Sequence, residues 1–522
     1  MGPVFKHYLP LLKLNQLSIF ALCYGLFLRL YCFIANKTIW HDEANIFFSL
    51  QSTPFSKLHL PLQGSPGGSY VFNLIEKIMF DFFGFSDYAL RFFPFIFSCL
   101  SFYLFFVILS RNFNHLICFL GTFLFAINDN LIFYAADIRP YSLDVFVTTI
   151  VLYFFFQITS QKQLTTNIFF KLTIVGSVLI FSSFISIFLL FSFGISVLIY
   201  FFNQKDFRFI KHLIVTGLIW IIVFYIYYTV SLQYWSEEES MIYYGNVFQF
   251  LHFPITSLYE LTENLIQCFR VVAFYCGLRL QAIGLYPSDF ISALNSIELF
   301  SNLFLKHALY LISIIILTTT TSVIIILSII NCFKSYKKNF FIIFIPIMLA
   351  IIASCLLKYP FLGRHLLYLF PLIILLLIFY LNELYKSKKT WFCICFFILF
   401  SFPFLSSVYH IYKPRTLYGL KQVLSIIETK KSTHTYILPL YNNWELFYKD
   451  KYNLNYNNVT TLSAVNEIFQ IPLSSNEIWL MYYGNTSRLP QIKTHFLTQN
   501  YNIKEIPIRD KNTYLFLIKK NM

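Results

Sequence analysis

The stretch Trp40-His41-Asp42-Glu43-Ala44 places two adjacent carboxylates a few residues beyond the first long apolar run, which begins near residue 16. Ionisable side chains at the mouth of a membrane helix are costly, so they mark a functional site unless another role explains them. The rest of the chain consists largely of further apolar runs. Between them lie other charged motifs, several of which are predicted to lie on the same side of the membrane as this pair. The stretch therefore predicts a membrane protein of many helices organised around one acidic pair.

The composition excludes an ordinary soluble globular protein. Of the 522 residues, 57% are hydrophobic, 21% are aromatic and only 12% are charged, whereas soluble domains carry about 25% charged residues. The formal net charge of +15 would suggest nucleic-acid binding in a soluble protein, but here most cations are assigned to cytoplasmic loops. We therefore predict an all-α polytopic membrane protein of about 11 transmembrane helices with no nucleic-acid partner.

Eleven segments are candidate membrane helices, because a bilayer core takes roughly 20 apolar residues per span. They begin near residues 16, 88, 114, 141, 167, 184, 209, 306, 339, 364 and 391. Residues 167–202 are too many for one span, and we divide them at Ser182-Ser183, which sets the side of every later connection. The first run is not a cleavable signal peptide, because Arg29 interrupts it and no small-residue cleavage site follows.

The charged residues separate by side when the N-terminus is placed inside. Positively charged residues are enriched in cytoplasmic connections, and the even-numbered connections carry Arg111, Lys162, Lys205, Arg208, Lys211, Lys334, Lys337, Lys338, Lys386, Lys388 and Lys389. The acidic segments fall on the other side: Asp42-Glu43, Asp129, Asp137 and Glu237-Glu238-Glu239. We expect a catalytic membrane domain over residues 1–411, with a first extracytoplasmic loop at 36–87 and a long one at 233–300.

The tail from residue 412 to 522 changes to mixed charge without a spanning run. Residues 418–429 have helical periodicity, and short apolar runs follow at 435–440, 477–483 and 513–518. These features predict a small extracytoplasmic α/β domain. Its sequence does not indicate its function.

The ten cysteines predict no metal site, since no CxxC motif and no Cys/His grouping with zinc spacing occurs. Eight of them lie in or beside apolar runs, and a disulfide between Cys268 and Cys276 remains open. No cofactor is predicted with certainty. A divalent cation at the carboxylates is the one cofactor that the sequence leaves open.

Charged groups suited to acid–base and phosphate chemistry share the predicted outer side. Asp42 and Glu43 supply a carboxylate pair that can act as a general base. Arginine donates two parallel hydrogen bonds to phosphate, and three arginines lie on this side: Arg91, Arg139 and Arg364.

Each of these residues also has a structural interpretation. Asp42-Glu43 could cap the amphipathic helix that begins there, and Arg91 could extend to the membrane interface. Arg139 could form an ion pair with Asp137, and Arg364 could anchor a helix end. His41 is interpreted as a solvated neighbour and is left out of the catalytic set.

Taken together, the motifs resemble those of the GT-C glycosyltransferases that use polyprenyl-phosphate sugars, the group of protein O-mannosyltransferases and lipid A aminoarabinose transferases. The resemblance covers residues 16–205 well, the later membrane part loosely and the tail only in general character. The matching stretches are Trp40-His41-Asp42-Glu43-Ala44, Ser65-Pro66-Gly67-Gly68-Ser69-Tyr70, Gly84-Phe85-Ser86-Asp87-Tyr88-Ala89-Leu90-Arg91, Asp137-Ile138-Arg139-Pro140-Tyr141 and Gly363-Arg364-His365-Leu366-Leu367.

The resemblance implies roles for individual residues. Asp42 would be the catalytic base or its closest partner, and Glu43 and Asp137 would line the acceptor pocket or a cation site. Arg139 and Arg364 would meet the donor phosphate, and the remaining substrate-binding candidates are Tyr70, Arg91, Tyr141 and His365. This chain departs from the group in two places: His365 stands where Tyr is more common, and Gly67-Gly68 replaces a bulkier Pro-Leu pair.

We therefore expect a hexosyl- or pentosyltransferase in a bacterial inner membrane. It would pass a sugar from a polyprenyl monophosphate to an envelope glycan, lipid or protein hydroxyl, by an inverting single displacement with Asp42 as base. One alternative is a transporter or flippase of a lipid-linked saccharide, which would need a continuous polar path through the spans. Another is a non-catalytic envelope assembly protein, which would not need the acidic pair.

Overall fold

The computed structural model describes residues 16–39, 41–62, 68–84, 86–160, 165–235, 250–278, 302–414, 420–428, 434–438, 459–462, 465–472, 477–483, 488–508 and 513–521. Parts of the motifs considered above lie outside the described residues: Trp40, Ser65-Pro66-Gly67, Phe85, Lys162 and Glu237-Glu238-Glu239.

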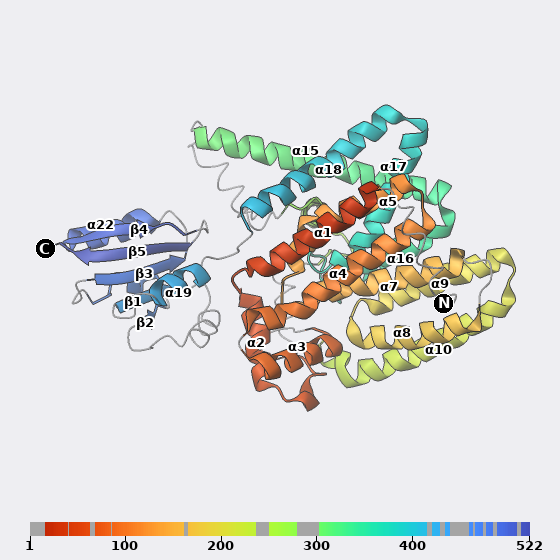
Figure 1. Ribbon diagram of the computed structural model, residues 1–522, viewed down its shortest axis with the longest axis horizontal. Helices are drawn as coiled ribbons and strands as arrows, with labels where there is room; N and C mark the ends of the chain where they lie inside the picture. The colour runs from red at the N-terminus through yellow and green to blue at the C-terminus, as the bar shows by residue number, and fades with distance from the viewer. Residues whose placement is uncertain are drawn as a thin grey trace.

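Apolar helices form most of the chain, and they coincide with the eleven predicted segments (Figure 1). They are α1 (Gln16–Ala35), α4 (Asp87–Asn112), α5 (His115–Ile127), α7 (Tyr141–Ser160), α8 (Thr166–Ser182), α9 (Ser186–Gln204), α10 (Phe207–Tyr227), α15 (Asn302–Ser335), α16 (Lys337–Cys355), α17 (Phe370–Ser387) and α18 (Lys389–Tyr412). Within the described residues, nine helices are long and apolar enough to cross a membrane, while α5 and α8 are shorter. The prediction of an all-α polytopic membrane protein is confirmed, and the count of eleven crossings stays a prediction.

The predicted division near Ser182 is confirmed. Helix α8 ends at Ser182 and α9 begins at Ser186, so two helices replace one overlong apolar run. The hydroxyl of Ser183 donates a hydrogen bond to Asp144 Oδ1 of α7 at 2.5 Å, and the hydroxyl of Ser69 donates to the carbonyl of Ser182. The break is therefore tied both to α7 and to the first loop.

The segments between the long helices are themselves largely helical. The first loop holds α2 (His41–Ser52), a 3-10 turn η3 (Phe55–Lys57) and α3 (Tyr70–Phe83). Later come α6 (Asp129–Tyr134), a π-helical segment η4 (Tyr228–Leu232), α11 (Gln233–Trp235), α13 (Leu258–Tyr275) and the 3-10 turn η6 (Leu367–Leu369). The amphipathic helix expected after Trp40 is present, with Asp42 and Glu43 in its first turn, where the helix dipole favours negative charge.

Helix α13 lies within the predicted long loop and begins with a capping box, in which Ser257 and Glu260 satisfy each other's backbone N–H groups. Cys268 lies on this helix and Cys276 directly follows it, and both are free thiols. The disulfide that the sequence left open is therefore not formed.

Arg29 joins α1 to its neighbours inside the helix bundle. Its side chain is fully buried and donates hydrogen bonds to the carbonyls of Gly25 and Phe125 and to the hydroxyl of Ser98. The guanidinium also lies 4.5 Å from the centre of the Phe102 ring, which favours a cation over an aromatic face. These contacts satisfy a cation that an apolar helix would otherwise leave unpaired.

The tail forms a five-stranded sheet in the order β2-β1-β3-β5-β4. Its strands are β1 (His434–Leu438), β2 (Val459–Thr461), β3 (Glu477–Tyr483), β4 (Tyr501–Ile506) and β5 (Thr513–Lys520), and its helices are α19 (Leu420–Glu428), α21 (Val465–Ile468) and α22 (Leu489–Thr498). Strand β1 pairs in parallel with β2 and β3, whereas β5 pairs antiparallel with β3 and β4. The predicted helix and three strands are confirmed, and β2 and β4 were missed.

Helix α19 lies between the sheet and α2 (Figure 1). Val423 and Leu424 of α19 belong to the same buried apolar cluster as Ala44 and Phe47 of α2 and Met481 of β3. The tail is therefore joined to the first loop by an apolar core as well as by the chain itself.

A second group of helix ends, away from the first loop, is joined by hydrogen bonds. Ser160 donates to Asn112, Asn114 donates to Asn382, and Lys338 donates to the carbonyl of Thr159. These groups lie close in sequence to the basic connections that were assigned to the cytoplasm. These contacts bring together the end of α4, the end of α7 and the start of α16, and they join the N-cap residue of α5 to α17.

We predict that Asp42, Asp137, Glu238 and residues 412–522 face away from the cytoplasm, and that Lys205 and Lys337 face it, because the positive-inside bias orients the helices. Reporter fusions at these positions, with labelling of single introduced cysteines from each side, would measure this. Cytoplasmic labelling of residues 233–300 would contradict the arrangement.

Candidate active site

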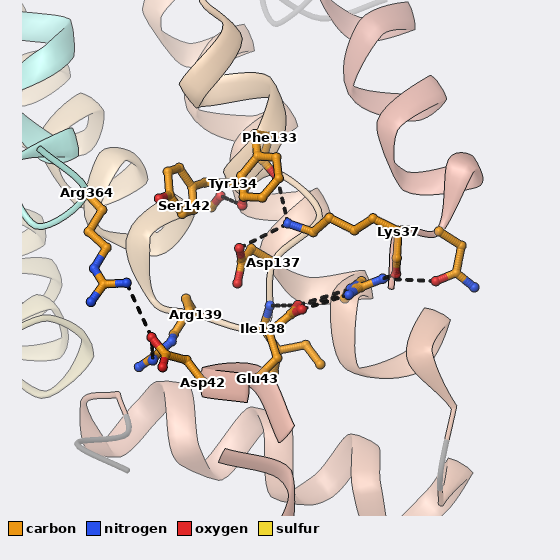
Figure 2. Close-up of polar contacts among 12 residues, drawn as sticks. Lys37, Asp42, Glu43, Phe133, Tyr134, Asp137, Ile138, Arg139, Ser142 and Arg364 are labelled. Carbon is orange, nitrogen blue, oxygen red and sulfur yellow. Dashed lines mark hydrogen bonds and ion pairs between the residues drawn. The ribbon is translucent and has the colours of Figure 1, made fainter. Parts of the chain in front are cut away.

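Asp42 binds two arginines that come from distant parts of the chain (Figure 2). Its Oδ2 lies 2.5 Å from Nη2 of Arg139 and 3.3 Å from Nη1 of Arg364. Asp42 lies in the first turn of α2, Arg139 lies between α6 and α7, and Arg364 lies between α16 and η6. The side chain of Asp42 keeps 23% of its surface exposed, so this carboxylate is accessible from outside the protein core.

The segment that carries Arg139 is held by its own backbone. The N–H of Arg139 donates to the carbonyl of Asp137 at 2.7 Å, and the N–H of Asp144 donates to the carbonyl of Pro140. Ser142 donates from its hydroxyl to the carbonyl of Tyr134. Because proline restricts the backbone where α7 begins, the direction of Arg139 is set by a short, bonded turn.

The segment that carries Arg364 is held from two sides. The hydroxyl of Tyr275 donates to the carbonyl of Leu366, and the hydroxyl of Tyr359 donates to the carbonyl of His365, both at 2.8 Å. A side chain at Gly363 would approach the ring of Phe274 to 2.4 Å. Glycine is therefore required for the close approach of this segment to α13.

Glu43, although adjacent to Asp42, is fully buried. Its two oxygens accept hydrogen bonds from Arg91, the shortest at 2.9 Å from Nη2 to Oε2, and Oε1 also accepts the backbone N–H of Ile138. Burial raises the pKa of Glu43, and the charge of Arg91 opposes that rise. Arg91 is itself buried and also donates to Asn36, so it does not extend to an interface as one interpretation of the sequence held.

Asp137 forms the second buried ion pair, with Lys37. The two groups approach to 3.0 Å from Nζ to Oδ2, and their side chains are 0% and 2% exposed respectively. The Lys37 ammonium also lies 3.3 Å from the centre of the Phe133 ring. Burial lowers the pKa of Lys37, and the Asp137 carboxylate opposes that change. Asp137 thus pairs with Lys37, and Arg139 pairs with Asp42, in place of the Asp137–Arg139 pair considered above.

The three carboxylates therefore differ in charge balance. Glu43 with Arg91 and Asp137 with Lys37 each form a neutral buried pair. Asp42 instead faces two guanidinium groups, those of Arg139 and Arg364, at a partly exposed position. An anion such as a phosphate would be attracted to that position.

His365 and Tyr141 lie beside the arginines. Their rings meet edge to face with centres 5.7 Å apart, and Tyr141 is buried at the start of α7. Burial, followed by the charges of Arg364 and Arg139, lowers the pKa of His365 well below its ordinary value of 6.5. His365 is therefore neutral near pH 7 and adds no charge to the site.

Tyr70 lies farther along the first loop, as the first residue of α3. It packs against both the large core of the helix bundle and the cluster that joins α2 to the tail. Among the described residues, no group of three or more His, Cys, Asp or Glu side chains could hold a metal ion. The carboxylates that were candidates for a divalent cation instead have Arg or Lys partners.

Sequence reasoning missed Lys37, which neutralises Asp137. Lys37 follows α1 on the predicted outer side, where the positive-inside bias leads us to expect few cations, and this unusual position was a usable signal. The partner of Arg91 was also missed, because nothing local in the sequence links two residues 48 positions apart.

We predict that Arg91→Ala destabilises the protein by about 3–5 kcal/mol, because removing one partner leaves the buried Glu43 carboxylate without its ion pair. Thermal unfolding of the purified variant in detergent would measure the loss. Arg208→Ala is the matched control, since its ion pair with Asp206 is largely exposed and is expected to contribute less than about 1 kcal/mol. Equal unfolding midpoints for the two variants would contradict the assigned role of Arg91.

Comparison with family models and with curated protein sequences gives no match. Among solved structures, the chain is similar to ArnT from Cupriavidus metallidurans bound to undecaprenyl phosphate, with 8% identity, 96% of this chain and 97% of that chain covered, and a TM-score of 0.46. The apo state of ArnT matches with 10% identity, 96% and 98% coverage, and a TM-score of 0.37. The Archaeoglobus fulgidus oligosaccharyltransferase in complex with Zn and sulfate matches with 10% identity, 95% and 72% coverage, and a TM-score of 0.43.

ArnT is a lipid A aminoarabinose transferase, and both proteins are GT-C glycosyltransferases, the class that the sequence motifs resemble. The chain is thus similar, over nearly its whole length, to solved glycosyltransferases of the GT-C type.

Proposed function

We propose that the protein is an integral-membrane glycosyltransferase of the GT-C type. It transfers a hexosyl or pentosyl group from a polyprenyl monophosphate to a hydroxyl of an envelope glycan, lipid or protein. The reaction takes place on the extracytoplasmic side of a bacterial inner membrane. The observation that carries this proposal is the contact of one partly exposed carboxylate, Asp42, with two arginines from distant segments, Arg139 and Arg364.

This contact supports group transfer because it combines the two chemical requirements of the reaction. A departing phosphate needs cations, and guanidinium groups bind phosphate through paired hydrogen bonds. An attacking hydroxyl needs a base within hydrogen-bond reach. Asp42 supplies the base, and the two arginines beside it supply the cations.

The phosphate of the donor competes with Asp42 for the arginines. When the phosphate binds to Arg139 and Arg364, it accepts the hydrogen bonds that their guanidinium groups gave to Asp42, and Asp42 is released from its ion pairs. A carboxylate whose oxygens are freed from guanidinium N–H groups can accept a hydrogen bond from the acceptor hydroxyl. Donor binding therefore prepares the base.

The transfer is a single displacement with inversion. The acceptor oxygen attacks the anomeric carbon, its proton passes to Asp42, and the bond from that carbon to the phosphate oxygen breaks. The electron pair leaves with the polyprenyl phosphate, whose added negative charge is stabilised by Arg139 and Arg364. No covalent sugar–enzyme intermediate is required.

Glu43 and Asp137 serve this reaction indirectly. Both are buried in ion pairs, so neither is accessible to a substrate hydroxyl. Their role is to hold Asp42 and Arg139 in position. Tyr141 and neutral His365 border the arginines and are the groups that would contact the donor sugar. Tyr70, at the start of α3, would contact substrate from the first loop.

We predict that Asp42→Asn abolishes transfer while the protein stays folded and binds donor. The amide keeps the shape of the side chain and costs about 1 kcal/mol or less as a helix-start residue, but it cannot accept the acceptor proton. Loss of a general base typically costs about 10² to 10⁴ in rate. The measurement is turnover of a radiolabelled polyprenyl-phosphate sugar pool by purified variants in nanodiscs.

Glu43→Gln is the neighbouring control. It is expected to lower stability more and the rate per folded molecule less than Asp42→Asn, because Glu43 acts through its buried ion pair. Near-normal transfer by Asp42→Asn would leave the acidic pair structural and would favour the transporter interpretation.

We predict that the double substitution Arg139→Ala and Arg364→Ala weakens donor binding by about ten- to a hundredfold, because charge-assisted hydrogen bonds contribute about 1.5–3 kcal/mol. Binding of a short-chain polyprenyl phosphate, measured by calorimetry in detergent, tests this. Arg208→Ala, a substitution of an exposed arginine on α10, is the matched control. Unchanged affinity in the double variant would reduce both arginines to structural anchors.

A further inference from the structure

Lys421, in the first turn of α19, connects the C-terminal domain to the first loop. Its ammonium group donates to the backbone carbonyl of Asn36 at 3.1 Å and to Oδ2 of Asp87 at 3.2 Å. The Asp87 side chain is fully buried, while that of Lys421 keeps 26% of its surface exposed. A cation from the tail thus neutralises a buried carboxylate at the start of α4.

Of the two residues that Lys421 contacts, Asn36 is hydrogen-bonded to Arg91 of the Glu43–Arg91 pair, and Asp87 lies on the same helix as Arg91. Asn36 accepts a hydrogen bond from Arg91 through its side-chain oxygen, at 3.0 Å, while its carbonyl accepts from Lys421. Asp87 lies one helical turn before Arg91 on α4. Lys421 therefore holds both the segment that follows α1 and the helix that presents Arg91.

The contact between Lys421 and the carbonyl of Asn36 depends on an uncommon backbone conformation of Asn36. Its φ angle is 42°, in the left-handed region that only glycine and a few residues such as asparagine adopt readily. This conformation directs the carbonyl of Asn36 to Lys421 and its side chain to Arg91. Loss of the Lys421 contact would remove one of the interactions that hold the turn.

The path from the tail to the candidate base is short. Lys421 binds Asn36, Asn36 binds Arg91, and Arg91 binds Glu43. Glu43 directly precedes Ala44 and follows Asp42 in the first turn of α2. Val423 and Leu424 of α19 also belong to the buried apolar cluster that contains Ala44 of the same turn.

We propose that Lys421 is a positioning residue for the transfer reaction, through which the docked C-terminal domain orients the first turn of α2 and so places Asp42 against Arg139 and Arg364. This inference rests on the proposed function for its chemical consequence. It also has a consequence that is independent of activity, namely that the contact protects α2 from local opening.

The test compares Lys421→Met with Lys493→Met in the full-length protein. Lys493 lies in the same domain and forms an ion pair with Glu505, in which both side chains are more than 40% exposed, so its substitution is the matched control. Lys421→Arg keeps the charge and serves as the conservative variant. Four quantities are measured: the amide hydrogen exchange of residues 41–52, the kcat, the KM for the donor, and the midpoint of thermal unfolding.

For Lys421→Met we expect faster exchange in α2 and a kcat lowered by up to about a hundredfold, since a displacement of about 1 Å can have that effect on catalysis. The KM for the donor should change little, because the arginines that bind phosphate are retained. Lys421→Arg should restore much of the loss, and Lys493→Met should behave as the unsubstituted protein. Asp87→Asn should produce the same increase in α2 exchange and the same fall in kcat. The double variant Lys421→Met with Asp87→Asn should show no larger change than either single variant, because both substitutions remove the same ion pair.

Unchanged α2 exchange in Lys421→Met would overturn the proposal, whatever happens to the rate. A fall in kcat that only parallels a fall in the unfolding midpoint, without a local change in α2, would also overturn it. If the unsubstituted protein transfers no sugar from any polyprenyl phosphate offered, the proposed function fails. In that case the exchange of α2 alone decides whether Lys421 positions this turn.

Discussion

The buried ion pair between Glu43 and Arg91 is the constraint on which the candidate site depends. Two charges removed from water are tolerated only when they are paired and their hydrogen-bonding capacity is used. Here the Glu43 carboxylate joins three segments, since it accepts from Arg91 of α4 and from the backbone N–H of Ile138 while belonging to α2. The observed orientation of the first turn of α2 satisfies both of these donors at once.

The contrast between Asp42 and Glu43 follows from helix geometry. Consecutive residues of an α-helix point about 100° apart, so one carboxylate of an adjacent pair can be buried while the next faces outward. Glu43 is enclosed, whereas Asp42 keeps 23% of its side chain exposed between Arg139 and Arg364. A buried pair resists exchange of partners, but a partly exposed carboxylate can exchange guanidinium groups for a substrate. On the proposed function, one carboxylate thus serves as a scaffold and its neighbour in the sequence as the reactive group.

The fold was largely predictable because the signals for it are local. The apolar runs, the division after Ser182 and the strand at Glu477–Tyr483 are each visible within a window of a few residues to one span. Strand β2 was missed because it is only three residues long, too short for alternation to show. The site was predictable only in part, because its ion pairs join residues 48, 100 and 322 positions apart.

By itself, the sequence determined that this is a membrane protein of many helices, where most of those helices begin, and which charged residues are candidates for chemistry. These properties follow from the transfer of apolar segments out of water, which is a sum over neighbouring residues. Only the tertiary structure decided that Asp42 meets two arginines, that Glu43 and Asp137 are enclosed with Arg91 and Lys37, and that Lys421 reaches the first loop. Those outcomes depend on which opposite charges come within hydrogen-bond distance in a low-dielectric interior, and that is a property of the packed chain rather than of any segment.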